Sequence, residues 1–402
     1  LTKAGAGMLT LSGANTFSGK TSIQNGALSV SSLNQVTGGS ASSNLGAPTT
    51  VANGTIDLGS GTTTGQLIYT GTGETTDRVL NLAGTTGGGT LTQSGSGNIR
   101  FASNLTATGS GSKTLTLQGS TAGTGEIAGV IVNNSATNLT RLIKADTGTW
   151  TLSGTNTNTG ATTINGGVLS ISALAKGGVA SNICTSTNAA AKLVLGGGTL
   201  QYTGGTVSTD RNFTLTAGTA STVDVATAGT NLTISGASAA TAGALTKAGA
   251  GTLTLSGNNT YTGATTINAG TLALGAANRI ANTSAVTVGG GATFNLNGFN
   301  ETIGSLAGAG AVTNNGAAAA ALTTGGNNTS TAFSGSLQDG TGTLALTKAG
   351  TGAFTLSGNN IYTGTTTINA GTLTASGGSA IADTSQVTLA NTAGATLNLA
   401  NS

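Results

Sequence analysis

One 30-residue pattern occurs four times in this chain, and it restricts the fold more than any other feature. The copies cover residues 1–30, 142–171, 245–274 and 346–375, and their lysines align as Lys3, Lys144, Lys247 and Lys348. Four more columns keep one residue type at fixed distances from the lysine: leucine (Leu11, Leu152, Leu255, Leu356), glycine (Gly13, Gly154, Gly257, Gly358), asparagine (Asn15, Asn156, Asn259, Asn360) and isoleucine (Ile23, Ile164, Ile267, Ile368). Such repetition is typical of a solenoid, in which each unit buries its apolar side by stacking on its neighbours.

The composition favours strands over disorder or helices. Only 6% of the residues are charged, glycine supplies 69 residues and proline one. A disordered chain would lack branched aliphatic residues, but here they recur in alternating strings such as Thr252-Leu253-Thr254-Leu255. Alternation with a period of two indicates β-strands, and so much glycine disfavours helical repeats.

The spacing inside a copy predicts the length of one coil. The interval between Leu253 and Leu272 equals the interval between Leu255 and Leu274, as expected if the chain has returned above itself. We therefore predict an all-β fold, a single-chain parallel β-helix with about 19–22 residues per coil, wound either right-handed or left-handed. A propeller is disfavoured because its blades recur about every 40 to 50 residues, whereas these lysines are 101 to 141 residues apart.

The repeat also predicts the domain organisation. We expect one continuous β-solenoid over residues 1–402, with internal units 1–141, 142–244, 245–345 and 346–402, of which the last is incomplete. The segment 395–399 repeats the segment 292–296, which in the earlier case is followed by a long insert before the next Leu-Thr-Lys. We interpret the chain as a window of a longer repeat array.

The repeated columns receive structural roles. We expect the leucine and isoleucine columns to form the core and the four aligned glycines to lie in turns, where a positive φ costs glycine nothing. Trp150 stands where other copies have Leu9, Leu253 or Phe354, so we interpret it as core. The asparagine column suits a side-chain ladder or an Asx-turn. We interpret the lysine column as solvated corners.

The chemistry-bearing residues favour no catalytic, metal or cofactor site. Histidine is absent, which removes Ser-His and Cys-His catalysis, and the single Cys184 excludes a disulfide framework and is interpreted as a small buried residue. Acid-base catalysis by Glu74 with Asp77, as in a polysaccharide-active β-helix enzyme, is the weaker alternative to structural ion pairs. The net charge of +3 is spread along the chain, so no nucleic-acid partner is expected.

Three aromatic residues occupy one position after the asparagine column. They are Phe17, Tyr261 and Tyr362, and the second copy has Asn158 instead. We expect these rings to be exposed, which makes them candidates for stacking on a glycan.

Residues 245–272, Leu-Thr-Lys-Ala-Gly-Ala-Gly-Thr-Leu-Thr-Leu-Ser-Gly-Asn-Asn-Thr-Tyr-Thr-Gly-Ala-Thr-Thr-Ile-Asn-Ala-Gly-Thr-Leu, closely resemble the autotransporter-associated β-strand repeat of bacterial type V secretion passengers. The second copy departs from that pattern at Asp146 and Asn158. The resemblance implies export across a Gram-negative outer membrane and a right-handed β-helix displayed outside the cell. It also implies an outer-membrane translocator, which we expect outside this segment.

The leading hypothesis is an extracellular structural or adhesive β-solenoid rod, forming a stalk or fibre of a bacterial surface-displayed or secreted repeat protein. It is expected at the cell surface, either anchored to the outer membrane or released. The alternative is a passive spacer that presents an enzyme or receptor-binding module located elsewhere. Candidate partners are other copies of the chain, in a fibre, and a cell surface or glycan, because low charge lets polar faces approach.

Overall fold

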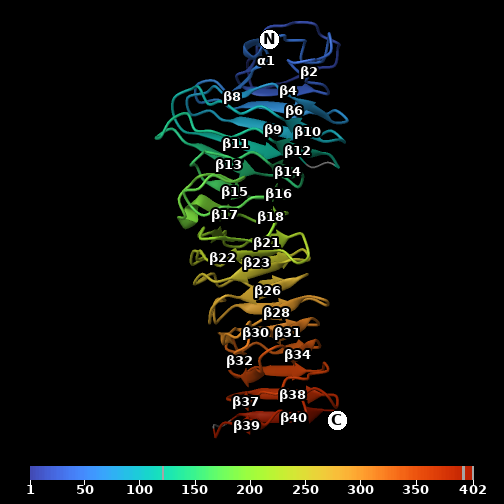
Figure 1. Cartoon of the computed structure of the whole chain (residues 1–402), viewed down its shortest axis with the longest axis vertical. Coiled ribbons are helices and arrows are strands. Elements are labelled where there is room, and N and C mark those ends of the chain that lie inside the picture. Colours follow the sequence, from blue (N-terminus) through green and yellow to red (C-terminus); the bar gives the residue numbers. More distant parts are fainter. Residues whose placement is uncertain (120–121, 392–393, 401–402) are drawn as a thin grey trace. The chain divides into compact units, whose positions relative to one another are not determined.

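The computed structural model describes residues 1–119, 122–391 and 394–400, and it shows short β-strands stacked coil upon coil (Figure 1). Within these residues helix is confined to the four-residue α1 (Val51–Gly54) and the 3₁₀ turn η1 (Ala190–Lys192). The contacts of the chain divide it into two units, Leu1–Thr203 and Gly204–Ser402. The predicted all-β, parallel β-helical fold is confirmed.

In the unit Leu1–Thr203 the strands form three stacks of parallel neighbours. One contains β1 (Thr2–Lys3), β3 (Thr21–Ile23), β5 (Ile56–Leu58) and β8 (Leu80–Leu82). Another contains β2 (Met8–Leu11), β4 (Gly26–Val30), β6 (Gly65–Tyr69), β9 (Gly89–Gln93), β11 (Lys113–Gln118), β13 (Thr140–Lys144), β15 (Thr162–Ile164) and β17 (Leu193–Leu195). The third contains β7 (Glu74–Thr76), β10 (Ile99–Phe101), β12 (Thr124–Ile127), β14 (Thr149–Leu152), β16 (Val168–Ile171) and β18 (Thr199–Tyr202).

The unit Gly204–Ser402 is built in the same way, with β20 (Thr214–Leu215) near its start. One stack contains β19 (Val207–Thr209), β22 (Asn231–Ile234), β24 (Thr252–Leu255), β26 (Thr271–Leu274), β28 (Thr293–Asn295), β31 (Ala311–Asn314) and β34 (Ser336–Asp339). Another contains β21 (Ala220–Val225), β23 (Ala244–Ala248), β25 (Thr265–Ile267), β27 (Ala285–Val288), β30 (Ser305–Gly308), β33 (Thr331–Phe333), β36 (Ala353–Leu356), β38 (Thr372–Ser376) and β40 (Thr396–Ala400). The third contains β29 (Glu301–Thr302), β32 (Ala320–Thr324), β35 (Leu344–Lys348), β37 (Thr366–Ile368) and β39 (Val387–Leu389).

The coils average about 24 residues, which is longer than the 19–22 predicted. Inside a repeat copy the predicted spacing holds, because Leu253 pairs with Leu272 as expected. Between copies the spacing grows, and Leu28 pairs with Leu67, which lies much further along the chain. The strands keep similar lengths and the extra residues lie in loops, so a spacing taken from the copies underestimates the mean coil.

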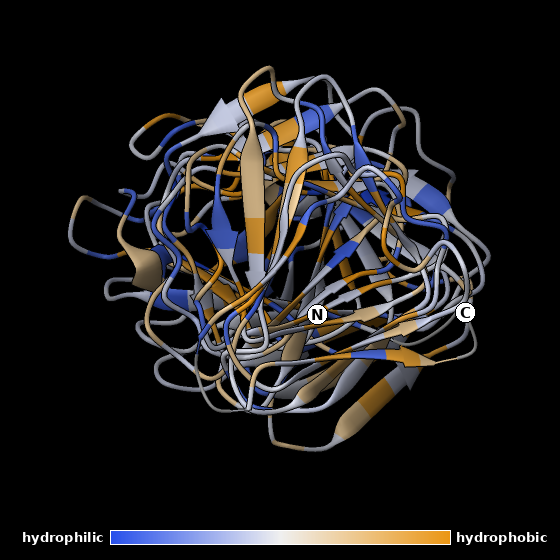
Figure 2. Cartoon of the chain, turned by 90° about the horizontal axis from the view of Figure 1, so that it is seen from below, coloured by the Kyte–Doolittle hydropathy of each residue, from blue (hydrophilic) through white to orange (hydrophobic). Residues whose placement is uncertain are grey.

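Alternation along the strands places the core between the sheets. Figure 2 shows hydrophobic and hydrophilic residues following one another along single strands, and in β11 every second side chain is buried. The leucines and isoleucines of the repeat columns are 0% exposed at Leu152, Leu255, Leu356, Ile23, Ile164, Ile267 and Ile368, while Leu11 is half-buried. Trp150 and Cys184 are also buried. Burial of these side chains is the main force that holds the coils together.

Candidate functional site: the repeated corner and the loops it holds

The lysine column lies inside the protein. Lys3, Lys144, Lys247 and Lys348 are 7%, 0%, 0% and 1% exposed, so the interpretation as solvated corners is wrong. Each lysine occupies an inward position of its strand and pairs with the isoleucine of the next coil, as Lys247 does with Ile267. The aliphatic part of the side chain therefore packs in the apolar column, and the ammonium group reaches the corner beyond the strand.

The ammonium group of each repeat lysine is surrounded by backbone carbonyl oxygens. Lys247 Nζ donates to the carbonyls of Ala248 (2.6 Å), Gly249 (2.8 Å) and, one coil further on, Ala269 (3.2 Å). The other three lysines make the same three bonds, to Ala4, Gly5 and Asn25, to Ala145, Asp146 and Gly166, and to Ala349, Gly350 and Ala370. An ammonium has three N–H donors, so every donor is satisfied.

Burial has an electrostatic consequence for these amines. It lowers the pKa of Lys247 to about 8, opposed in part by the carboxylate of Asp224. It also lowers the pKa of Lys144 to about 8, opposed by Asp146. The group remains an enclosed donor that joins two coils, and it does not form a cationic binding stripe.

The asparagine column joins three coils. Asn259 Oδ1 accepts the backbone N–H of Ser238 in the preceding coil (2.9 Å), and its Nδ2 donates to the carbonyl of Arg279 in the following coil (3.0 Å). Asn360 makes the equivalent bonds to Leu337 and Ala380. In the second copy Asn156 accepts from Ile131 and donates to Asn182. These side chains therefore bond to the backbone of the preceding and following coils, which differs from both the side-chain ladder and the Asx-turn expected.

The expected exposure of the aromatic residues is wrong for both tyrosines. Tyr261 and Tyr362 are 0% exposed, so neither ring can stack on a glycan, while Phe17 is half-buried. The Tyr261 hydroxyl bonds to Thr265 Oγ1 (2.8 Å), and Tyr362 makes the same bond to Thr366 (2.6 Å). Burial raises the pKa of both hydroxyls. These residues complete the core of the corner.

Three of the four aligned turn glycines are needed for space. Gly13, Gly154, Gly257 and Gly358 are not among the residues with positive φ, contrary to the expectation. A Cβ at Gly257 would lie 2.0 Å from the carbonyl oxygen of Gly236 in the preceding coil, and at Gly358 it would lie 1.8 Å from that of Gly335. At these two positions, and at Gly154, the coils approach so closely that no side chain fits, whereas at Gly13 the nearest atom would lie 3.8 Å from a Cβ.

Two loops of the unit Leu1–Thr203 leave the coil after a repeat copy and return to its corner. In the first, Asn44 Oδ1 accepts the N–H of Ser31 (2.8 Å) and Asn44 Nδ2 donates to the carbonyl of Gly13 (3.0 Å). In the second, Asn182 makes the equivalent bonds to Ser172 and Gly154, at 2.9 and 3.0 Å. We call residues 31–47 and 172–185 the re-entrant loops.

Acidic residues hold the first re-entrant loop from the next coil. The Glu74 carboxylate accepts the N–H groups of Leu33 and Asn34, and the Asp77 carboxylate accepts those of Val36 and Thr37. Burial raises the pKa of Glu74, whereas at Asp77 the amide bonds outweigh burial and the pKa lies below its usual range.

The basic residue beside these acids is buried as well. Arg78 is 1% exposed and donates to the carbonyl of Leu45 (2.8 Å). Burial lowers its pKa to about 10, opposed by Glu74 and Asp77. The Glu74–Asp77 pair considered for catalysis is therefore engaged in binding the backbone of the loop.

A buried carboxylate plays a similar part in the unit Gly204–Ser402. Glu301 is 1% exposed, and its carboxylate accepts the N–H groups of Arg279 and Ile280, both at 2.9 Å. Burial raises the pKa of Glu301 to about 7, and the amide bonds and the Arg279 charge oppose that rise. This acid titrates near neutrality while it holds the loop after the third copy.

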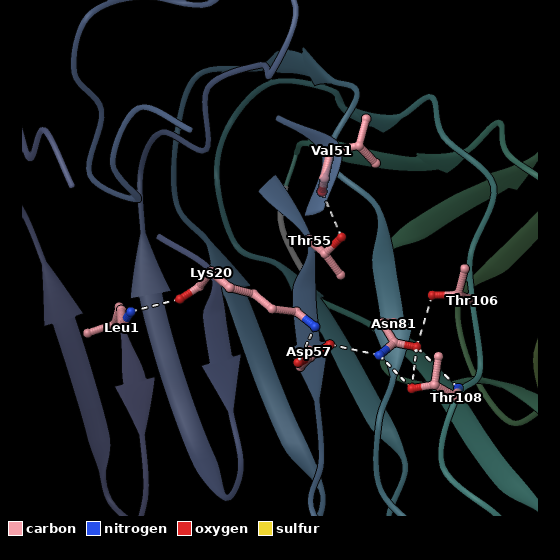
Figure 3. Close-up of polar contacts among 8 residues, drawn as sticks. All are labelled: Leu1, Lys20, Val51, Thr55, Asp57, Asn81, Thr106 and Thr108. Carbon is pink, nitrogen blue, oxygen red and sulfur yellow. Dashed lines mark hydrogen bonds and ion pairs between the residues drawn. The ribbon is translucent and has the colours of Figure 1, made fainter. Parts of the chain in front are cut away.

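A ladder of polar side chains crosses the outer face of the first coils (Figure 3). Lys20 Nζ lies 2.7 Å from the Asp57 carboxylate, which also accepts from Asn81 Nδ2 at 2.7 Å. Asn81 Oδ1 in turn accepts from the hydroxyls of Thr106 and Thr108. The ladder runs from coil to coil on side chains that pair with one another.

The described residues contain no group of three or more histidine, cysteine, aspartate or glutamate side chains able to hold a metal ion. Among the same residues, no helix has the length and apolar character needed to cross a membrane. The fold and its corners define the class of protein: a parallel β-solenoid with a repeated corner of buried lysine and asparagine.

Comparison with known proteins agrees with that class. Residues 1–30, 142–171, 245–274 and 346–375 match the passenger-associated-transport-repeat family. The chain is 40% identical over 374 residues to the adhesin BmaC autotransporter of Brucella suis biovar 1 (strain 1330). That match covers 91% of this chain and 10% of the relative's length, and no solved structure matches. The resemblance to autotransporter passenger repeats that the sequence predicted is confirmed for these four segments.

Proposed function

We propose that this chain is an extracellular segment of a bacterial surface adhesin, and that it supplies length and stiffness to a rod displayed outside the cell. The observation that carries the proposal is the recurrence of the same lysine knot, one ammonium bonded to three carbonyls of two coils, in all four copies. The relative's name, an adhesin autotransporter, supports the part of the proposal that places the segment in a surface adhesin.

The geometry suits a passenger that folds as it leaves the membrane. The third carbonyl bound by each lysine lies 22 residues further along the chain, so each knot closes within about one coil. Contacts between successive coils let folding propagate from one coil to the next. A chain with one cysteine forms no internal disulfide, so its folding outside the cell does not depend on one.

The test asks whether the chain itself makes adhesive contact. Beads coated with the 402-residue chain are incubated with host cells, and bound beads are counted against beads coated with an unrelated β-solenoid. We expect specific binding if the segment is adhesive. Binding equal to that of the control would support the alternative, a passive spacer that presents a module located outside the segment.

Further proposals concern assembly, attachment, the course of the coil and glycan contact. Self-association into fibres predicts a mass in solution that rises with concentration, measured by light scattering. Cell fractionation would distinguish anchoring to an outer-membrane translocator from release into the medium. Two predictions concern the coil, namely its continuity over residues 1–402 and its right-handed winding, and electron cryo-microscopy tests both. Glycan contact at Phe17 also stays a prediction, which a glycan array tests.

A further inference from the structure

The third repeat copy has a fully bonded polar cluster in its core. The Tyr261 hydroxyl bonds to Thr265 Oγ1 at 2.8 Å, and Thr265 in turn contacts Ser284 Oγ at 3.3 Å. Ser284 donates to the carbonyl of Gly263 at 2.7 Å, which closes the chain of bonds. Each of these buried hydroxyls therefore has a partner, the condition under which burying polar groups costs little.

The second copy lacks this cluster. Asn158 stands in place of the tyrosine, is 0% exposed and donates through Nδ2 to the carbonyl of Thr140 at 3.0 Å. Asn158 Oδ1 and Thr140 Oγ1 are both buried and have no hydrogen-bond partner. Two unpaired polar atoms in one corner make the folded state of this coil less favourable than that of a satisfied one.

The backbone of the second copy is also strained at the lysine corner. The residue two positions after the lysine has φ of +75° at Gly249 and +66° at Gly350. In the second copy that residue is Asp146, with φ of +55°. A side chain in the left-handed region costs energy that glycine avoids.

The lysine and asparagine bonds of the two corners are the same. Lys144 and Lys247 each bond to three carbonyls, and Asn156 and Asn259 each join the coils on either side. On the other side of the second copy Trp150 is buried in β14 and its indole N–H donates to the carbonyl of Gln118 at 2.9 Å. The weakness is therefore confined to the side of β13 and β15.

We propose that the second copy is a site of low local stability, where strands β13 and β15 open while the rest of the coil stays folded. Local opening is governed by the interactions lost in the opened segment, and here two polar atoms gain water on opening and one strained residue relaxes. This inference concerns local stability and stands whether or not the segment is adhesive.

Hydrogen exchange of the intact chain tests the proposal on matched amides. The N–H of Leu142 bonds to the carbonyl of Ala161, and that of Leu245 bonds to Ala264, each at 2.9 Å. We expect the protection factor of Leu142 to be about tenfold or more below that of Leu245. Equal protection, or stronger protection at Leu142, would overturn the proposal.

Two isosteric variants supply the control. Thr140→Val removes an unpaired hydroxyl and should raise the protection of Leu142 about threefold or more, whereas Thr265→Val removes a bonded hydroxyl and should lower that of Leu245. Lowered protection of Leu142 in Thr140→Val would contradict the assignment of the unpaired atoms as its cause.

Discussion

Replacing Lys247 by methionine tests whether the buried ammonium stabilises the corner. Methionine retains much of the apolar side chain but leaves the carbonyls of Ala248, Gly249 and Ala269 without their donor. A hydrogen bond to a charged group contributes about 1.5 to 3 kcal/mol, so three contribute roughly 5 to 9 kcal/mol. Removing a buried cation offsets part of this loss.

The size of that offset follows from the pKa. Burial lowers the pKa of Lys247 from 10.5 to about 8, and each pKa unit corresponds to about 1.4 kcal/mol, which makes roughly 3 kcal/mol. The net destabilisation of the corner is therefore about 2 to 6 kcal/mol. In hydrogen exchange this corresponds to a loss of protection of roughly thirtyfold or more at the amides of β23 and β25.

Lys20→Met is the matched control, because the Lys20 side chain is 44% exposed and its ion pair with Asp57 lies at the surface. A surface ion pair contributes about 1 kcal/mol or less. The two variants remove the same charge, so a shared effect would come from net charge alone. If the amides of β23 and β25 lost no more protection in Lys247→Met than in Lys20→Met, the ammonium would not hold the corner and the reasoning would be refuted.

The other predictions use the same repeated corners. Because the pKa of Glu301 is raised from 4.5 to about 7, its stabilising contribution is complete below about pH 4.5 and is lost as the pH rises through 7. Urea denaturation should therefore show a decrease of roughly 3 kcal/mol between pH 4.5 and 7.5 that Glu301→Gln removes. Asn259→Ala should weaken the third corner by about 1 to 3 kcal/mol, seen as faster exchange of the Ser238 N–H, because that group loses its acceptor. The single variant Asn158→Phe should destabilise the second copy, and the double variant Asn158→Phe with Cys184→Gly should destabilise it far less. Additive effects in a double-mutant cycle would contradict this coupling.

The reason for that last coupling is visible in the first re-entrant loop. Phe17 packs there against Gly46, where a Cβ would lie 2.8 Å from the ring. The second loop presents Cys184 at the equivalent place, and the ring is replaced by Asn158. In the first copy the large Phe17 faces a glycine, and in the second copy the smaller Asn158 faces the larger Cys184. The packed volume of the two pairs is therefore similar.

The sequence was informative where side chains alternate and uninformative where the chain turns. The period of two and the repeated leucine interval predicted the strands and the pairing of Leu253 with Leu272. The same alternation could have placed Lys247 inside, because it lies two residues after the inward Leu245. Its charge suggested solvent, and nothing in the sequence showed that three carbonyls would meet it.

Corners obey no such alternation, which explains the remaining errors. Tyr261 lies between β24 and β25, so no strand pattern indicated which way its ring points. A glycine in a turn can be needed for its φ or for space, and the sequence does not distinguish Gly270, which has φ of +61°, from Gly257, which touches the preceding coil. The re-entrant loops lie outside the repeated pattern, so their length was not part of the predicted coil.

The register of each repeat copy explains why a lysine belongs in this corner. Lys247 pairs with Ile267, whereas Leu253 beyond the corner pairs with Leu272, and the first of these two intervals is longer by one residue. The corner that follows the lysine therefore holds one residue more than the corner stacked next to it, and the other three copies show the same difference. Stacked corners of unequal length cannot pair all their backbone groups with each other. The carbonyls left without a backbone partner point to the ammonium, so the lysine compensates for the extra residue. If Gly249 is deleted, the corner should no longer need the lysine.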